Sequence, residues 1–395
     1  MSGTIFMNKL MEGVSVEWTT LGDEFFLEVA NAARRPVKAS LRVSGMVPYY
    51  GANNIQDYVD GHTHDGEYVL IAEDGSASPE NYSVQYATGK FWANNHVHVV
   101  RGKEGLNTRF LYHYLCAVDF IPYLPNKDRS KLTKGEMIKI PLPIPCPDNP
   151  KKSLEIQAEI ARILDAFTEL TAGLTAELTA RKKQYDYYRD QLLRFDDGDV
   201  DWKMLGEVAK YSKTRISFER LEKTNYVGVD NLLKNRVGKS ESNYVPTSGN
   251  FTEYREGDIL IGNIRPYLRK IWQADRAGGT NGDVLVIHPN DTVNARYLFQ
   301  VLADEKFFEW NMQHAKGAKM PRGNKDKIME YRFQVPKNPT EQARIAFILD
   351  KFETLTNSLA DGLPREIALR QKQYAHYRDL LFDFPKPETA LAASE

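Results

Sequence analysis

Two long stretches of the chain carry apolar residues at every third or fourth position, the spacing that aligns side chains on one face of an α-helix. In the first, around residues 153–194, the series is Ile160, Ile163, Phe167, Leu170, Leu174 and Leu178. In the second, around residues 340–383, it is Ile345, Ile348, Phe352, Leu355, Leu359 and Leu363. The spacing predicts two long helices with matching apolar seams. Pro364, which follows Gly362, predicts a kink or a short interruption in the second helix.

The two helical stretches belong to an internal repeat that runs through the whole chain. The segment VEWTTLG at residues 16–22 returns as VDWKMLG at 200–206, and ILDAF at 163–167 returns as ILDKF at 348–352. A third match, QYDYYRD at 184–190 against QYAHYRD at 373–379, is shifted further by about one helical turn. The chain therefore consists of two copies of one repeated unit.

The segments between the helices read as mixed α/β modules. Apolar or alternating runs at 68–72, 96–100, 258–261 and 283–287 predict strands, and each module closes with a proline-punctuated strand at 140–145 or 333–336. We expect a first globular module at 1–152, a spacer helix at 153–196, a second module at 197–339, and a second helix with its tail at 340–395. The fold class is mixed α/β, with the helices paired as an antiparallel coiled coil. The alternative is that each helix lies on the core of its own module.

Length, composition and charge limit the classes of protein. The 395 residues are 42% hydrophobic, enough for two cores, and no apolar run approaches the length of a membrane span. We also find no signal pattern at the start and expect a cytoplasmic protein. Cys116 and Cys146 are too few for a disulfide framework or a four-cysteine zinc site. A formal net charge of −1 means that nucleic-acid binding would depend on local basic patches.

Basic residues gather at matching places in the two modules, just before the proline-punctuated strand. The first cluster comprises Lys127, Arg129, Lys131, Lys134 and Lys139, and the second comprises Lys316, Lys319, Arg322, Lys325 and Lys327. Aligning the final strands places Lys131 on Arg322 and Lys134 on Lys325. This recurrence predicts two equivalent positive surfaces for DNA phosphates, although charge runs are usually only solvated faces.

A further basic run follows the strand at 258–261 in the second module. It contains Arg265, Tyr267, Arg269 and Lys270, a mixture that suits phosphate contacts and guanine-directed arginine contacts. Asn324 is a weaker candidate, since asparagine reads adenine but most often forms turns.

The sequence contains none of the motifs expected for catalysis or cofactor binding. An adenine methyltransferase would need an Asn/Asp-Pro-Pro-aromatic loop and a glycine-rich cofactor turn, and ATP binding would need a Gly-x-x-x-x-Gly-Lys-Ser/Thr loop. His62, His64, His96 and His98 form two pairs that suggest a metal, but packing or hydrogen bonding is the commoner role for such residues. No catalytic residue and no metal site is therefore predicted.

Two variable modules alternating with two near-identical helices resemble the specificity subunit of type I restriction–modification enzymes over essentially the whole chain. The segment LTAGLTAEL at 170–178, followed by RKKQY at 181–185, resembles the Thr-Ala-Glu-Leu helix repeats of one subclass, with Gly173 as a departure. The resemblance implies that each module reads half of an asymmetric bipartite DNA site and that the helices set the spacing. It also implies two modification subunits that hold S-adenosylmethionine, and restriction subunits that use ATP and Mg²⁺.

Two other functions are compatible with parts of the sequence. A coiled-coil scaffold for protein assembly would share the helices without reading DNA. A methyltransferase acting unaided is disfavoured by the missing motifs. DNA binding separates the first of these from the main hypothesis, and binding of S-adenosylmethionine by the chain alone would support the second.

Overall fold

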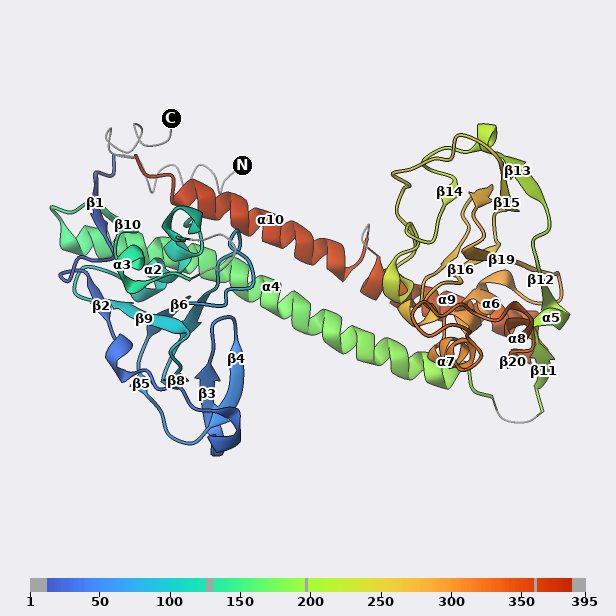
Figure 1. Ribbon diagram of the computed structural model, residues 1–395, viewed down its shortest axis with the longest axis horizontal. Coiled ribbons are helices and arrows are strands. Elements are labelled where there is room, and N and C mark those ends of the chain that lie inside the picture. Colours follow the sequence, from blue (N-terminus) through green and yellow to red (C-terminus); the bar gives the residue numbers. More distant parts are fainter. Residues whose placement is uncertain (1–12, 126–130, 196–197, 359–360, 386–395) are drawn as a thin grey trace. The chain divides into compact units, whose positions relative to one another are not determined.

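The computed structural model describes residues 13–125, 131–195, 198–358 and 361–385, and the chain divides into two compact units. Unit 1 contains residues 1–171 and 369–395, and unit 2 contains residues 172–368. Each unit therefore combines one module with segments of both helical stretches (Figure 1). The mixed α/β class predicted from the sequence is confirmed.

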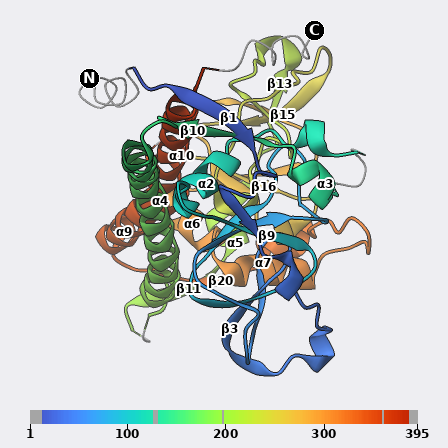
Figure 2. The same cartoon turned by 90° about the vertical axis from the view of Figure 1, so that its left-hand side faces the viewer.

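Unit 1 contains two four-stranded sheets and a separate two-stranded ribbon. One sheet has the order β2-β9-β6-β7, the second has the order β4-β3-β8-β5, and β1 pairs antiparallel with β10. The strands are β1 (Val16–Thr20), β2 (Leu27–Val29), β3 (Ser44–Tyr50), β4 (Ile55–Val59), β5 (His64–Asp65), β6 (Tyr68–Ala72), β7 (Val84–Ala87), β8 (Lys90–Ala93), β9 (Val97–Gly102) and β10 (Pro141–Pro145). Figures 1 and 2 show the β1–β10 ribbon and β3 at opposite ends of the unit.

Unit 2 repeats this plan with its own four-stranded sheets. Their orders are β12-β19-β16-β17 and β13-β15-β18-β14, and β11 pairs antiparallel with β20. The strands are β11 (Val200–Met204), β12 (Ala209–Tyr211), β13 (Arg215–Ser217), β14 (Tyr226–Val227), β15 (Asn250–Tyr254), β16 (Ile259–Gly262), β17 (Ile271–Gln273), β18 (Gly278–Thr280), β19 (Val284–Pro289) and β20 (Arg332–Pro336). The strands predicted from apolar runs correspond to β6, β9, β16 and β19. The proline-punctuated segments form β10 and β20, each in a two-stranded ribbon that demands few ladder hydrogen bonds.

The long helix α4 (Pro150–Leu192) begins in unit 1 and ends in unit 2. The second helical stretch is interrupted as Pro364 predicts, with α9 (Pro339–Asn357) followed by α10 (Leu363–Leu381). Shorter helices are α2 (Thr108–Leu115) and α3 (Lys134–Met137) in unit 1, and α5 (Leu205–Val208), α6 (Ala295–Leu302), α7 (Glu305–Gln313) and α8 (Lys325–Met329) in unit 2. No helix in the described part of the chain is both long and apolar enough to span a membrane.

The predicted helix seam divides into two kinds of contact. Ile160 and Ile163 are buried in the core of unit 1, and Ile345 in that of unit 2, so the start of each helix packs on its own module. The same two cores also contain Leu381 of α10 and Tyr185 of α4, so packing on a module and pairing of the helices occur together. Further along, Phe167 stacks on Tyr377 in unit 1, while Phe352 stacks on Tyr185 and Tyr188 in unit 2. A later residue of α4 thus meets an earlier residue of the second stretch, as an antiparallel pair requires.

The remaining seam positions vary in exposure. Leu170 is 45% exposed, which its place in an apolar seam did not predict. Leu359 lies outside the described residues. The half-buried positions are Leu174, Leu178, Ile348, Leu355 and Leu363. The apolar seam is therefore strongest where the aromatic residues meet.

Candidate nucleic-acid interface

In unit 2 the structure brings the two predicted basic segments together. The loop after β16 and the loop between α7 and α8 are joined through backbone hydrogen bonds. The Arg265 N–H donates to the Pro321 carbonyl (2.7 Å), and the Gly323 N–H donates to the Asn263 carbonyl (3.0 Å). Lys316 and Arg322 exchange backbone hydrogen bonds of 2.8 and 2.9 Å. Arg265, Lys316 and Arg322 therefore share one edge of unit 2.

The cationic side chains of this edge differ in whether they form an ion pair. Arg265 is exposed, with a positive φ of 53°, and its guanidinium pairs with no group in the part of the chain that is described. Lys316 and Lys319 are also exposed. Arg322, by contrast, forms an ion pair with Asp283 at 2.8 Å and is 53% exposed. This edge presents three unengaged cations and one that shares its charge with a carboxylate.

Arg269 and Lys270 hold the loop rather than face solvent freely. Arg269 forms an ion pair with Glu305 of α7, and the Lys270 ammonium donates to the Val229 carbonyl at 2.6 Å. Burial lowers the pKa of Lys270. These contacts give both residues a structural role that the sequence did not indicate, and they leave Arg265 as the arginine of this run that is available to DNA.

The equivalence predicted between the basic clusters holds in position. The backbone of Lys131 forms an isolated β-bridge with Asp74, just after β6. The backbone of Arg322 forms the corresponding β-bridge with Ile264, just after β16. Lys134 is the first residue of α3 and Lys325 the first of α8. Lys131 and Lys134 are exposed, as is Lys325. Lys127 and Arg129 lie outside the described residues, and Lys139 and Lys327 pair with neighbouring glutamates.

Asn324 has a different role from the one predicted. Its side-chain oxygen accepts hydrogen bonds from the backbone N–H groups of Asp326 (3.1 Å) and Lys327 (3.4 Å), so it caps the first turn of α8. The acceptor needed to read adenine is therefore already occupied. Two buried asparagines beneath this loop, Asn263 and Asn311, have side-chain atoms without a partner in the described structure.

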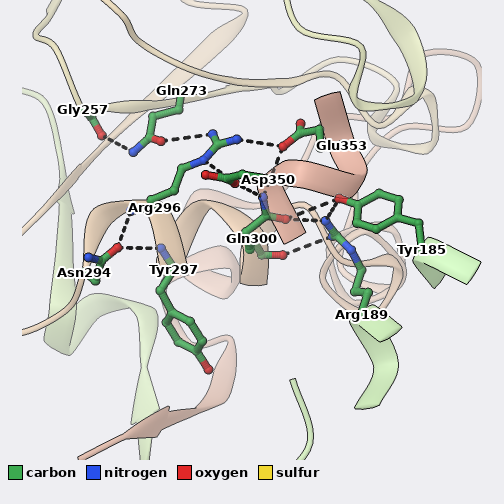
Figure 3. A network of polar contacts seen from close by, with 10 residues as sticks. All are labelled: Tyr185, Arg189, Gly257, Gln273, Asn294, Arg296, Tyr297, Gln300, Asp350 and Glu353. Atoms are coloured by element: carbon green, nitrogen blue, oxygen red, sulfur yellow. Dashed lines mark hydrogen bonds and ion pairs between the residues drawn. The ribbon is translucent and has the colours of Figure 1, made fainter. Parts of the chain in front are cut away.

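A second set of polar residues ties each module to the helices, and the sequence reasoning missed it. In unit 2, Arg296 of α6 pairs with Asp350 (2.7 Å) and Glu353 (2.8 Å) of α9 (Figure 3). Gln300, also on α6, donates to Asp350 at 2.7 Å and accepts from Arg189 of α4 at 2.5 Å. Helix α6 is thus fixed to both α9 and α4.

Unit 1 contains a similar arrangement in which two residue types differ, at the positions of Gln300 and Glu353. Arg109 of α2 pairs with Asp165 of α4 (2.6 Å), and His113 takes the place of Gln300. His113 is buried and bridges Asp165 (2.7 Å) and the Tyr374 hydroxyl of α10 (3.2 Å). Arg378 donates to the Cys116 carbonyl at the end of α2 (3.1 Å), as Arg189 donates to the Gln300 carbonyl in α6.

The charged groups of this arrangement respond differently to burial in the two units. Burial lowers the pKa of His113. Although burial raises the pKa of Asp165, hydrogen bonds from Arg109 and His113 outweigh it and hold this pKa below its ordinary value. Glu353 has no acidic counterpart in unit 1, where Thr168 stands, and burial raises its pKa. A signal for these sites was present in the sequence, since Asp165 and Asp350 lie inside the ILDxF repeat.

Three of the four histidines in the two pairs have hydrogen-bonding or packing partners, and His62 is exposed. Buried His98 contacts the Leu132 carbonyl at 2.8 Å, His96 contacts Asp74, and His64 stacks on Phe91. Within the described ranges, no group of three or more histidine, cysteine, aspartate or glutamate side chains is placed to hold a metal ion.

Comparison with solved structures shows which known proteins share this fold. The fold matches the S subunit of a type I restriction–modification system from Mycoplasma genitalium with a TM-score of 0.65 and 15% identity, covering 96% of this chain and 99% of that one. A second match, with a TM-score of 0.52 and 14% identity, comes from a structural study of assembly and conformational transition in a type I system, and covers 93% and 97% of the two chains. These likenesses show the fold.

The sequence comparisons establish the family. The model for the type I restriction modification DNA specificity domain matches twice, at residues 15–180 and 199–369. A Haemophilus influenzae protein described as a type I restriction enzyme specificity subunit is 44% identical over 96% of this chain and 98% of its own length. The Escherichia coli EcoR124I/EcoR124II specificity subunit is 33% identical over 98% and 99%. The chain belongs to the type I restriction–modification DNA specificity family.

Proposed function

We propose that unit 1 and unit 2 each read one half of a bipartite DNA site through the loop edge that follows β6 or β16. The observation that carries this proposal is the junction of the Arg265 loop with the Lys316–Arg322 loop, which gathers unengaged cations beside a rigid sheet. Cations placed in this way neutralise phosphates, and an arginine with a free guanidinium suits bidentate contact with guanine. Lys131 and Lys134 mark the corresponding edge of unit 1.

The site is expected to be asymmetric because the two edges differ. The residues after β6 are Glu73 and Asp74, whereas those after β16 are Asn263, Ile264 and Arg265. Glu73 is neutralised by Arg34 at 2.7 Å. Two edges with such different charge and hydrogen-bonding groups would select different base sequences.

The chain is proposed to act without a catalytic site of its own, as the missing methyltransferase and ATP motifs favour. Two modification subunits would supply S-adenosylmethionine, and restriction subunits would supply ATP- and Mg²⁺-dependent steps. We further propose membership of the subclass with Thr-Ala-Glu-Leu helix repeats, on the wording of residues 170–178, and a cytoplasmic location.

The proposal is tested by the salt dependence of DNA binding. The full chain, purified with its modification subunit, is compared with the variant Lys316→Ala/Lys319→Ala/Arg322→Ala on duplex DNA. The variant should bind all sequences more weakly, and the slope of log K against log salt should fall by nearly one for each phosphate that is no longer neutralised. Arg265→Ala should instead relax the preference at one base pair, at a cost of ~1–3 kcal/mol.

The matched control is Lys151→Ala/Lys152→Ala/Arg162→Ala at the start of α4. It also removes two exposed lysines and one arginine that is paired with a carboxylate, since Arg162 contacts Glu159 at 2.7 Å. Equal salt slopes for the wild type and both triple variants would place the DNA surface elsewhere.

A further inference from the structure

One segment of unit 1 is basic and apolar at once, although the module as a whole carries more acidic than basic residues. From Val29 to Gln56 the sequence has four cations, Arg34, Arg35, Lys38 and Arg42, and no aspartate or glutamate. Arg35 and Lys38 are exposed, and neither side chain pairs with a group that the structure describes. Two positive charges are therefore available at the protein surface.

Beside these cations lies an unusual concentration of exposed apolar side chains. Met46 is 90% exposed, Leu41 70%, Val43 67% and Tyr58 53%. They share the end of the β3–β4 hairpin where β3 begins and β4 ends, and we call these four residues the apolar tip. Single exposed apolar residues are ordinary, but several on one short stretch of chain and its paired strand are typical of a binding surface.

A bulge in the backbone of β3 determines the position of Met46. The register between β3 and β4 shifts between Ser44 and Val47, which both pair with Val59, so Gly45 and Met46 form a bulge. A Cβ atom on Gly45 would lie 2.4 Å from the Val59 backbone, so only glycine allows this close approach. The bulge gives Met46 a fixed position at the extreme of the hairpin.

The platform beneath the tip is rigid. The Val37 N–H donates to the Tyr49 hydroxyl (3.1 Å), and the Arg42 guanidinium lies over the Tyr49 ring at 4.1 Å while pairing with Asp57 at 3.3 Å. Trp92 donates to the Arg35 carbonyl at 2.7 Å. Tyr49 itself is only 1% exposed. The arm at residues 35–46 is therefore held in place before any partner binds.

The apolar tip also lies within reach of the edge proposed to bind DNA. At the other end of β3, Asn53 donates to the Gly75 carbonyl at 2.7 Å, in the loop whose Asp74 forms a backbone β-bridge with Lys131. Met46 is four residues from Tyr50 along β3, a strand rise of about 13 Å. Both surfaces could therefore follow one stretch of duplex.

We propose that this arm is a second DNA contact of unit 1, in which Met46 acts as an apolar wedge at a base step in the minor groove while Arg35 and Lys38 contact the flanking phosphates. This inference rests on the proposed function. Among macromolecules, DNA offers phosphates for the cations immediately beside base faces for the apolar side chain. Protruding methionine, leucine and similar residues partly unstack base steps in this way. The arm would then make unit 1 sensitive to how easily its half-site deforms.

The test follows base unstacking directly. Modified adenines are first mapped in cells that express the complete system, which identifies the half-site of each unit. Duplexes then carry 2-aminopurine at successive positions across the unit 1 half-site and its flanks, and are bound by the full chain with its modification subunit. The wild type should raise the fluorescence at one step outside the modified adenine, which the modification subunit unstacks itself. Met46→Ala should abolish that signal and weaken binding on the order of tenfold, about 1.4 kcal/mol. Met46→Leu should restore both, because leucine keeps an apolar wedge.

The salt dependence separates the wedge from the cations. Met46→Ala should leave the salt slope unchanged, whereas Arg35→Gln and Lys38→Gln should each lower it by about one. The matched control is Phe25→Ala, which removes a 69%-exposed aromatic residue outside the arm and should change neither signal.

Three results would contradict the inference. If the wild type binds the bipartite site and 2-aminopurine gives no signal outside the modified adenine, the wedge is wrong and the proposed function stands. If Met46→Ala binds DNA normally but no longer binds the modification subunit, the apolar tip is a protein-docking surface. If the wild type shows no preference for a bipartite site, the proposed function itself fails.

Discussion

Unit 1 and unit 2 share their frame and differ at their edges. The strand order β3-β8-β5 in unit 1 matches β14-β18-β15 in unit 2, with one parallel and one antiparallel pairing in the same places. The fourth strand is added on opposite sides: β4 joins β3 in unit 1, whereas β13 joins β15 in unit 2. The added strand thus changes which edge of an otherwise constant sheet is extended.

The contacts with the helices are the part that stays constant. Arg109 and Arg296, Asp165 and Asp350, and Tyr374 and Tyr185 occupy corresponding positions, and each arginine pairs with its aspartate. The repeat therefore preserves the arginine–aspartate contacts that attach each module to the helices. The loops proposed to face DNA differ between the two units. Such a division allows a new module to be accepted without changing the helices.

The largest expected effect comes from breaking the helical phase that both units share. Inserting two residues after Leu178 would rotate the later part of α4 by about 200°, turning Tyr185 and Arg189 away from Phe352 and Gln300. We expect loss of the folded unit 2 core and of assembly with the modification subunit. Circular dichroism and size-exclusion chromatography of the co-expressed complex measure both.

A four-residue insertion at the same position is the control for that prediction. It advances the helix by only slightly more than one turn and lengthens it by ~6 Å, so the seam should be kept. The complex should assemble and prefer a target gap longer by about one or two base pairs, as methylation of a library with varied gaps would show. If both the wild type and this variant prefer the same gap, the helices do not set the spacing.

A smaller effect should separate the two arginine–aspartate pairs. Asp165→Ala leaves both Arg109 and the buried His113 without their acceptor, whereas after Asp350→Ala the guanidinium of Arg296 still contacts Glu353. We expect Asp165→Ala to cost about 1–3 kcal/mol, and Asp350→Ala clearly less.

Amide hydrogen exchange measures the two sites separately, because α2 reports on unit 1 and α6 on unit 2. Increased exchange should be confined to α2 in the first variant. The exposed pair between Arg162 and Glu159 gives the control Glu159→Ala, which should change neither helix detectably. Equal destabilisation of α2 and α6 would mean that Glu353 does not substitute for Asp350.

Much of the frame was predictable from sequence because it depends on periodic patterns. The seams, the break that precedes Pro364 and the strands at 68–72 and 259–262 all follow from local spacing and backbone chemistry. The alignment of Lys131 with Arg322 was also predictable, since both precede a repeated strand by similar distances.

The sites were less predictable because side-chain partners come from distant segments. Nothing local indicates that Arg269 pairs with Glu305, that Lys270 reaches the Val229 carbonyl, or that His113 meets Tyr374. The exposure of Met46 depends on a bulge opposite Val59, which a strand pattern does not show. Leu170 failed as a seam residue for the same reason, because periodicity gives the helix face but not what covers it.

The smallest expected effect concerns pH and tests the exchange of Gln300 in unit 2 for His113 in unit 1. Burial lowers the pKa of His113, so the folded state disfavours the protonated imidazole. A folded-state pKa below the unfolded value means that this contribution to stability is present above about pH 6.5 and is lost as the pH falls through the folded-state pKa. Mild acidification should therefore lower the stability of unit 1. After correction for the intrinsic exchange rate at each pH, the amides of α2 should exchange faster, whereas those of α6 should not.

The variant His113→Gln gives unit 1 the residue that unit 2 already has. A glutamine retains a donor for Asp165 without a titratable group, so we expect stability at neutral pH to stay within about 1 kcal/mol of the wild type. The difference between α2 and α6 in this pH range should disappear. The pKa of Asp165 is also lowered, so its contribution to stability is lost as the pH falls below the ordinary value near 4. This separate loss of stability should remain in the variant. If acid loosens α2 equally in the wild type and in His113→Gln, the pH response of unit 1 does not come from this histidine.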